Sequence, residues 1–136
     1  MKGGAFYLTN HVSKKAEKMY NYFMLVGRIS KEPDVVSFPD GKKVVNVSVA
    51  VSRSFRNTKG EIETDFFTVA FWDFLVDFVI DTVKVGMPVG IKGRIQNSVR
   101  TLSNSFQMTV PSLIGERIIF FGEGSNKTAE EEKNEE

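Results

Sequence analysis

Hydrophobic and polar side chains alternate most regularly over residues 43–53. Valines stand at every second position there, with small or polar residues between them: Val45, Val47, Val49 and Val51 against Asn46, Ser48, Ala50 and Ser52. A period of two with β-branched residues on one side is typical of a half-buried strand. Comparable runs predict strands over residues 20–29, 64–72, 88–96 and 113–121, with shorter extended pieces at 35–38 and 106–110.

The strand predicted over residues 64–72 has two unequal faces. One face is uniformly large and apolar, and we expect it to line the core: Phe67, Val69 and Phe71. The other face carries two large rings, Phe66 and Trp72, with only Thr68 and Ala70 between them. Small residues flanked by rings favour a shallow outer surface over a packed interior.

The hydrophobic period lengthens after Trp72. Apolar residues at helical spacing predict a helix over residues 73–85, with Leu75, Phe78, Val79 and Val83 on its buried side. Asp73 suits the N-cap and Gly86 suits the C′ position after the last turn. Asp77, Asp81 and Lys84 lie on the opposite side and indicate a solvated face.

The order of these elements favours one architecture. Three main strands, one helix and two more main strands follow one another between residues 20 and 121. This is the order of a five-stranded Greek-key OB barrel, an all-β fold with one helix between its third and fourth strands. A doubly wound parallel sheet would need βαβ alternation. An SH3-like barrel would lack the helix, and an immunoglobulin-like sandwich would have more strands.

Composition narrows the chemistry. The 136 residues include no Cys and one His, which excludes disulfides, thiol catalysis and Cys-ligated metals. Gly86, Gly90 and Gly93 match neither a P-loop nor a dinucleotide fingerprint. We therefore expect no enzyme activity, no cofactor and no metal. The aspartates of the predicted helix are the sole support for the alternative of a small metal-dependent hydrolase.

Charge and complexity divide the chain into three parts. Residues 1–18 carry four lysines and one glutamate without the apolar segment of a secretory signal, and we expect a disordered leader. Residues 19–122 carry twelve basic and ten acidic side chains and hold the predicted OB domain. Residues 123–136 carry two lysines and six glutamates with almost nothing to bury, which predicts a disordered acidic tail.

Rings and cations occur together in this sequence in a way that suits single-stranded nucleic acid. Such a strand stacks its bases on flat rings, and its phosphates attract cations. Phe55 lies in a polar loop predicted over 54–63, while Phe66 and Trp72 share the shallow face. The cations lie beside these rings or on the outward side of the fourth strand: Arg53, Arg56, Lys92, Arg94 and Arg100. Taken singly, each ring also suits core packing or a subunit contact, and each cation suits ordinary surface charge.

Several short motifs also follow one another in a familiar order. They are Leu-Val-Gly-Arg-Ile at 25–29, Lys-Glu-Pro-Asp-Val at 31–35, Pro-Asp-Gly at 39–41, the valine strand at 45–51, Asp-Phe-Phe-Thr-Val-Ala-Phe-Trp at 65–72 and Val-Gly-Ile-Lys-Gly-Arg-Ile at 89–95. With them, residues 20–122 resemble the bacterial-type single-stranded DNA-binding protein family. The resemblance implies an OB fold, a homotetramer and stacking rings at Phe55, Phe66 and Trp72. A further ring after the fourth strand is missing or replaced by Arg100, and the acidic tail lacks the hydrophobic tip by which the family recruits partner proteins.

The sequence as a whole therefore predicts a protein that binds single-stranded DNA without sequence preference. We expect it to protect such DNA in replication, repair and recombination, in the cytoplasm at the nucleoid, with the mitochondrial matrix less favoured. No membrane partner is expected, and Phe67 and the apolar first strand (Tyr22, Met24, Val26) are candidates for subunit contacts. The alternative is a replication-restart-type OB module that acts mainly in protein assembly, which the low net charge and the absent ring favour.

Overall fold

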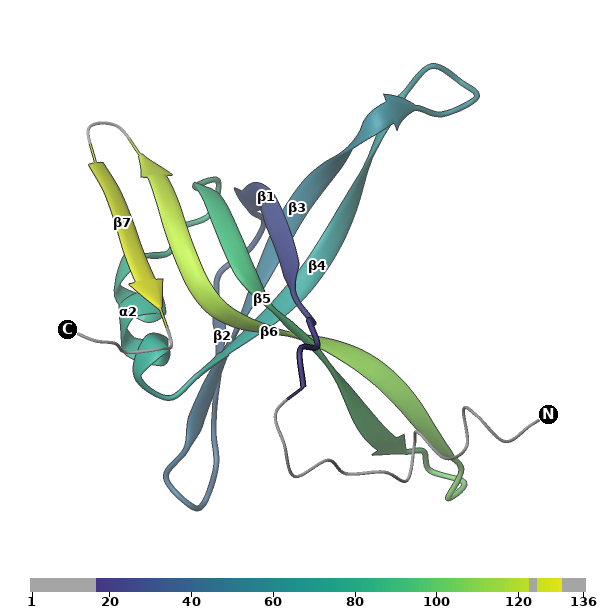
Figure 1. Cartoon of the computed structure of the whole chain (residues 1–136), viewed down its shortest axis with the longest axis vertical. Coiled ribbons are helices and arrows are strands. Elements are labelled where there is room, and N and C mark those ends of the chain that lie inside the picture. The colour runs from purple at the N-terminus through teal and green to yellow at the C-terminus, as the bar shows by residue number, and fades with distance from the viewer. Residues whose placement is uncertain (1–16, 123–124, 131–136) are drawn as a thin grey trace.

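The structure is a computed structural model that describes residues 17–122 and 125–130. Its elements in chain order are β1 (Phe23–Ile29), β2 (Asp34–Ser37), β3 (Lys43–Arg56), β4 (Ile62–Trp72), α2 (Phe74–Thr82), β5 (Pro88–Thr101), β6 (Gln107–Gly122) and β7 (Ser125–Glu130). Figure 1 shows a twisted barrel with the helix at one side and two long hairpins, β3–β4 and β5–β6, on the other. No helix in the described part of the chain is long and apolar enough to cross a membrane.

Five strands close the barrel. β1 pairs with both β3 and β5, β5 pairs with β6, and β4 pairs with β3, all antiparallel. A short parallel pairing of β4 with β6, at Val69↔Leu113 and Ala70↔Ile114, completes the ring. This confirms the predicted OB-fold barrel, with the helix after the third of the five barrel strands. β2 is an added edge strand on β3, so that third strand is labelled β4.

The core follows the sequence pattern. Val45, Val47 and Val49 are fully buried, as the alternation along β3 predicts. Val69 and Phe71 of β4 are buried on the same side, and Leu75, Val76 and Val79 of the helix cover one end of this core. Phe67, predicted for the same face, is only half-buried because β4 is leaving the barrel at that point.

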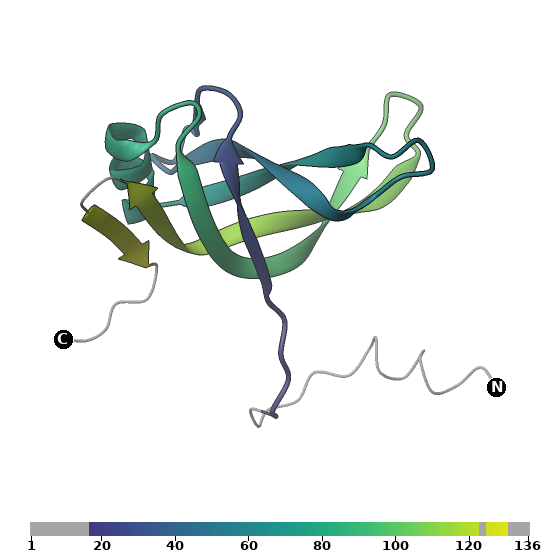
Figure 2. The same cartoon turned by 90° about the horizontal axis from the view of Figure 1, so that it is seen from above.

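The strands are longer than the sequence indicates. β5 continues to Thr101 and β6 begins at Gln107, so the loop predicted over 97–105 shrinks and the last two extended pieces are one strand. In the same way, β3 and β4 extend into the loop predicted over 54–63. In a two-stranded ribbon the facing backbone groups bond to each other and the outward ones bond to water, so pairing continues without the apolar alternation that marks a core strand. Figure 2 shows both ribbons reaching out on the side away from α2.

The helix boundaries also differ from prediction. Asp73 precedes the helix, but its side chain makes no capping hydrogen bond and its backbone φ is 60°. The helix ends at Thr82, and Val83 is buried in extended conformation. Gly86 is therefore not a helix cap: with φ at 89°, it forms a turn whose N–H donates to the carbonyl of Ile29 at 2.8 Å.

The acidic C-terminal segment contains one element that the sequence did not indicate. Ser125–Glu130 form β7, which pairs antiparallel with β6, whereas the sequence placed these residues in a disordered tail. Pairing along a free strand edge uses backbone groups and needs no apolar side chains, so composition gave no signal for it. The predicted leader up to residue 16 and the rest of the tail lie outside the described residues.

Candidate nucleic-acid interface

Two hollows meet beside the outer face of β4. One has a volume of about 540 Å³ and reaches from Phe66 inward to Phe67 and Leu113. The other, of about 480 Å³, extends from Trp72 towards β5. They share four lining residues and so form one continuous depression, which we call the β4 groove: Asn46, Ala70, Arg100 and Ser112.

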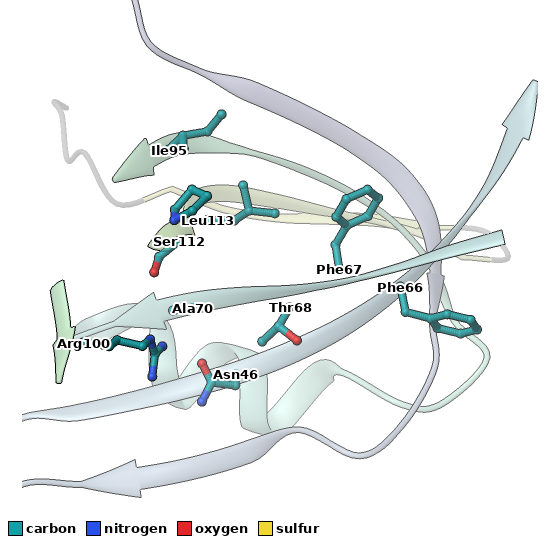
Figure 3. Close-up of a pocket in the computed structure, with 10 residues that line it drawn as sticks. Asn46, Phe66, Phe67, Thr68, Ala70, Ile95, Arg100, Ser112 and Leu113 are labelled. Carbon is teal, nitrogen blue, oxygen red and sulfur yellow. The ribbon is translucent and has the colours of Figure 1, made fainter. Parts of the chain in front are cut away.

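The outer face of β4 forms one wall of this groove. Phe66, Thr68, Ala70 and Trp72 all line it, which is the face that the sequence indicates as shallow. Phe66 exposes 67% of its surface, and the small side chains of Thr68 and Ala70 leave the groove open between the two rings. Figure 3 shows Phe66 and Phe67 pointing to opposite sides of the strand.

Trp72 is held by a ring that the sequence analysis missed. Phe38, in the turn between β2 and β3, stacks on the indole with ring centroids 5.6 Å apart and planes 16° from parallel. Phe38 thus covers one side of Trp72, which is half-buried and still lines the groove. A large apolar residue before the Pro39-Asp40-Gly41 turn was the available signal, but its partner is remote in sequence.

Two of the predicted arginines lie in the groove. Arg94 forms an ion pair with Glu116 at 2.8 Å and lines the part near Trp72. Arg100 is exposed and lines both hollows, and Figure 3 shows it on the same side as Asn46 and Ala70. The structure therefore brings together four of the predicted residues: Phe66, Trp72, Arg94 and Arg100.

Lys92 lies apart from these four. It lines a different hollow with Met24 and Val26 of β1, and its ammonium group lies 5.5 Å from the centre of the Tyr22 ring. The pairing of β5 with β6 shifts register between Lys92 and Gly93. Simple alternation along β5 put Lys92 and Arg94 on one patch, but they border different hollows.

The β3–β4 ribbon carries the other three predicted residues. Phe55 exposes 63% of its surface beyond the barrel. The pairing of β3 with β4 is irregular between Ser52 and Arg56, so Phe55 lies in a bulged stretch. The Nη1 of Arg56 donates to the carbonyl of Gly60 at 2.8 Å across the ribbon's tip.

Arg53 connects β3 to β4 beside this bulge. Its Nε and Nη2 each donate to Asp65 at 3.0 Å, and its Nη1 donates to Glu63 at 2.8 Å. The hydrogen bond with Asp65 is the main reason that the pKa of Arg53 is raised and the pKa of Asp65 is lowered. Asn57 adds a further bond to Glu63, so the guanidinium belongs to a network that ties the two strands together.

The aspartates of α2 do not form a metal centre. Among the described residues, no group of His, Cys, Asp and Glu side chains is arranged to hold a metal ion. Asp77 instead pairs with Lys43 at 3.7 Å, and Asp81 is exposed. These contacts fit a solvated helix face and give the hydrolase alternative no support.

The barrel topology and the groove of rings and arginines define an OB-fold protein with an open, ring-lined face. The chain belongs to the single-strand binding protein family, whose model matches residues 20–121.

The similar proteins agree with this assignment. Over 102 residues the chain is 33% identical to single-stranded DNA-binding protein B of Bacillus subtilis. The matched region covers 75% of this chain and 90% of that protein. It is 32% identical to the Bacillus cereus single-stranded DNA-binding protein, over 75% of this chain and 60% of that one. A solved Plasmodium falciparum SSB complex with ssDNA matches 79% of this chain and 100% of its own, with a TM-score of 0.65 and 27% identity.

Proposed function

We propose that this protein binds single-stranded DNA without sequence preference and acts as a binder, not as an enzyme. One observation carries the proposal: Phe66, Trp72, Arg94 and Arg100 line a single open groove on an OB barrel. Relatives in the same family are named for single-stranded DNA binding. A role in protecting DNA during replication, repair and recombination, at the nucleoid in the cytoplasm, follows from the same proposal.

The groove suggests how the strand is held. Phe66 and Trp72 are six residues apart on β4, a separation of about 20 Å, so they stack with different bases. Arg94 and Arg100 lie across the groove and contact the phosphates between these bases. The strand then continues along the β3–β4 ribbon to Phe55 and Arg56. Lys92 lies beside Tyr22, Met24 and Val26, so we place it outside this path.

We assign Arg53 a different role from the other cations. Its guanidinium is already bonded to Glu63 and Asp65, so a phosphate would have to displace two carboxylates to reach it. Bulges commonly turn a side chain in a new direction, and here the bulged residue is Phe55. Arg53 therefore serves as a positioning residue for the Phe55 ring.

Subunit assembly would multiply the binding surface. Tyr22, Met24 and Val26 expose 63%, 64% and 59% of their surfaces on and beside β1. An exposed apolar patch of this kind suits contact with further copies, and we propose a homotetramer. Joined grooves then bind one strand at high effective concentration. Phe67 was the other candidate for a subunit contact. Because it lines the inner end of the β4 groove, we place the subunit contacts on the β1 patch alone.

The first test compares forms of nucleic acid. Single-stranded DNA should bind much more tightly than duplex DNA of the same length, because bases that are already stacked in a duplex cannot reach the rings. Affinities for mixed-sequence and homopolymer strands should be similar, since every base has a face that can stack. Titration of labelled oligonucleotides, followed by fluorescence anisotropy at several salt concentrations, gives both comparisons. Equal affinity for the duplex would exclude stacking in the groove as the mechanism.

A second candidate function is an assembly module with weak nucleic-acid affinity. Its support is that Arg53 and Arg94 are paired with acidic side chains, which lowers the positive charge available to phosphates. The same titration separates the two. A dissociation constant for single strands no lower than about 10⁻⁴ to 10⁻⁶ M at physiological salt, the range reached by electrostatic attraction alone, would favour the assembly module.

Arg53 and Arg100 are expected to respond differently to substitution. Arg100→Met should flatten the dependence of log affinity on log salt by about one unit, because a phosphate contact is lost. Arg53→Met should leave that slope nearly unchanged and weaken binding only as far as Phe55 loses its orientation. In a Phe55→Ala background, Arg53→Met should therefore have no further effect. A slope change as large as that of Arg100→Met would show that Arg53 contacts phosphate directly.

A further inference from the structure

One face of the β5–β6 ribbon, which we call the groove face, lines the part of the β4 groove near Trp72, while Ile95, Pro111 and Leu113 of the other face line the part near Phe66. Arg94, Gln96, Ser98 and Arg100 of β5 line the groove together with Ser112 and Ile114 of β6. Residues opposite one another in an antiparallel pair project to the same side. Arg94 pairs with Ile114, Gln96 with Ser112, Ser98 with Val110 and Arg100 with Met108. The groove face therefore runs along the ribbon as far as the pair formed by Arg100 and Met108.

Beyond this point one more pair lies on the groove face, after the pair of Thr101 with Gln107 on the other face. The N–H of Leu102 donates to the carbonyl of Phe106 at 2.8 Å, so these two residues continue the alternation on the groove face. The hairpin then closes through Ser105, whose φ is 67° and whose N–H donates to the carbonyl of Leu102 at 2.9 Å. Asn104 accepts a hydrogen bond from the N–H of Phe106 at 3.0 Å. The tip is thus a hydrogen-bonded turn that holds the backbone of Phe106 in place.

Phe106 is unusually exposed for a ring in such a turn. It leaves 60% of its surface in solvent, close to the 67% of Phe66 and the 63% of Phe55. The pair of Arg100 with Met108 is the next pair on the same face, two residues or about 7 Å further along the ribbon. A ring beside a cation, in line with the rest of the groove, has the same composition as the site around Trp72 and Arg94.

We propose that Phe106 is a further binding residue, on which a base of single-stranded DNA stacks at the outer end of the β4 groove. In this arrangement Arg100 binds a phosphate of the DNA, and the next base stacks on the Phe106 ring. This inference rests on the proposed function, because it places one more contact on the same DNA path. The remaining candidate occupant of the tip is a second copy of this chain, which the experiment also tests.

The affinity test uses two variants on opposite faces of the same ribbon. Phe106→Ala should weaken binding to single-stranded DNA by about 5- to 150-fold, the range for one stacked base, and the loss should persist at high salt. Phe106→Tyr keeps a flat ring and should bind like the wild type. Val99 exposes 66% of its surface but pairs with Thr109 on the other face of the ribbon. Val99→Ala should therefore change the affinity by no more than about twofold.

A spectroscopic test locates the contact directly. The chain has a single tryptophan, so Phe106→Trp in a Trp72→Phe background moves the only indole to the tip of the ribbon. Saturation with single-stranded DNA should quench its emission. The matched chain with Val99→Trp in the same background should show little quenching, because that ring lies on the face of the ribbon opposite Arg94 and Arg100, which carry the proposed DNA path.

The outcomes separate this inference from the proposed function. If the wild type fails to bind single-stranded DNA, the proposed function is wrong and the tip has no DNA path to extend. If the wild type binds but Phe106→Ala binds equally well, or both tip indoles are quenched to the same extent, the inference alone is wrong. If Phe106→Ala changes the mass of the oligomer in sedimentation and loses affinity only for that reason, the tip is a subunit contact and the inference is overturned.

Discussion

Replacing Phe71 by alanine is expected to lower the free energy of unfolding by about 3–5 kcal/mol, the usual cost of deleting a buried aromatic ring. Phe71 has no exposed surface and lies on the core side of β4. Its ring occupies the space next to Gly115 of β6, where a Cβ at Gly115 would overlap it. This contact lies beside the short parallel pairing that closes the barrel, so the cavity would open at the seam. Denaturant titration followed by far-ultraviolet circular dichroism measures the loss.

Two further variants serve as controls for this measurement. Phe71→Leu keeps most of the apolar volume and should cost clearly less than the alanine variant. Phe66→Ala removes a ring of the same size from the exposed face of the same strand, and its effect on stability should stay within about 0.5 kcal/mol. Similar losses for Phe66→Ala and Phe71→Ala would contradict the assignment of the two faces of β4.

The barrel could be predicted from the sequence because its strands bury one face. Val45, Val47 and Val49 on β3 and Val69 and Phe71 on β4 alternate with polar or small residues, and all five are fully buried. The two ribbons could not be predicted to their full length because both of their faces are solvated. Alternation between apolar and polar residues disappears there, although the backbone pairing continues to Thr101 and Arg56.

The groove was predictable in part for a related reason. The positions of Phe66 and Trp72 follow from alternation within one strand, so the sequence places them on one face. The stacking of Phe38 on Trp72 and the bonds from Arg53 to Glu63 and Asp65 depend on how strands pair. With residues 54–63 interpreted as a loop, no opposing strand was expected beside Arg53.

The last prediction concerns Trp72, whose emission reports on one place in the molecule because it is the only tryptophan. Single-stranded DNA should quench this emission strongly by stacking in the β4 groove. Trp72→Ala should weaken binding by about 1–3 kcal/mol, and the loss should persist at high salt because stacking releases no counterions. Trp72→Phe should recover most of the affinity. Fluorescence titration and anisotropy of a labelled strand measure the two effects separately.

Phe38 provides the matched variant for this test. It covers one side of the indole, so Phe38→Ala should shift the emission of the free protein by admitting water to that side. Its effect on DNA affinity should be smaller than that of Trp72→Ala, because the indole that meets the base is still present. If Trp72 instead serves packing alone, Trp72→Ala would lower the melting temperature as much as it lowers affinity, and DNA would leave the wild-type emission unchanged. Unquenched emission at saturation, with binding established by anisotropy, would therefore remove Trp72 from the interface and leave Phe66 as the ring on β4 that meets the bases.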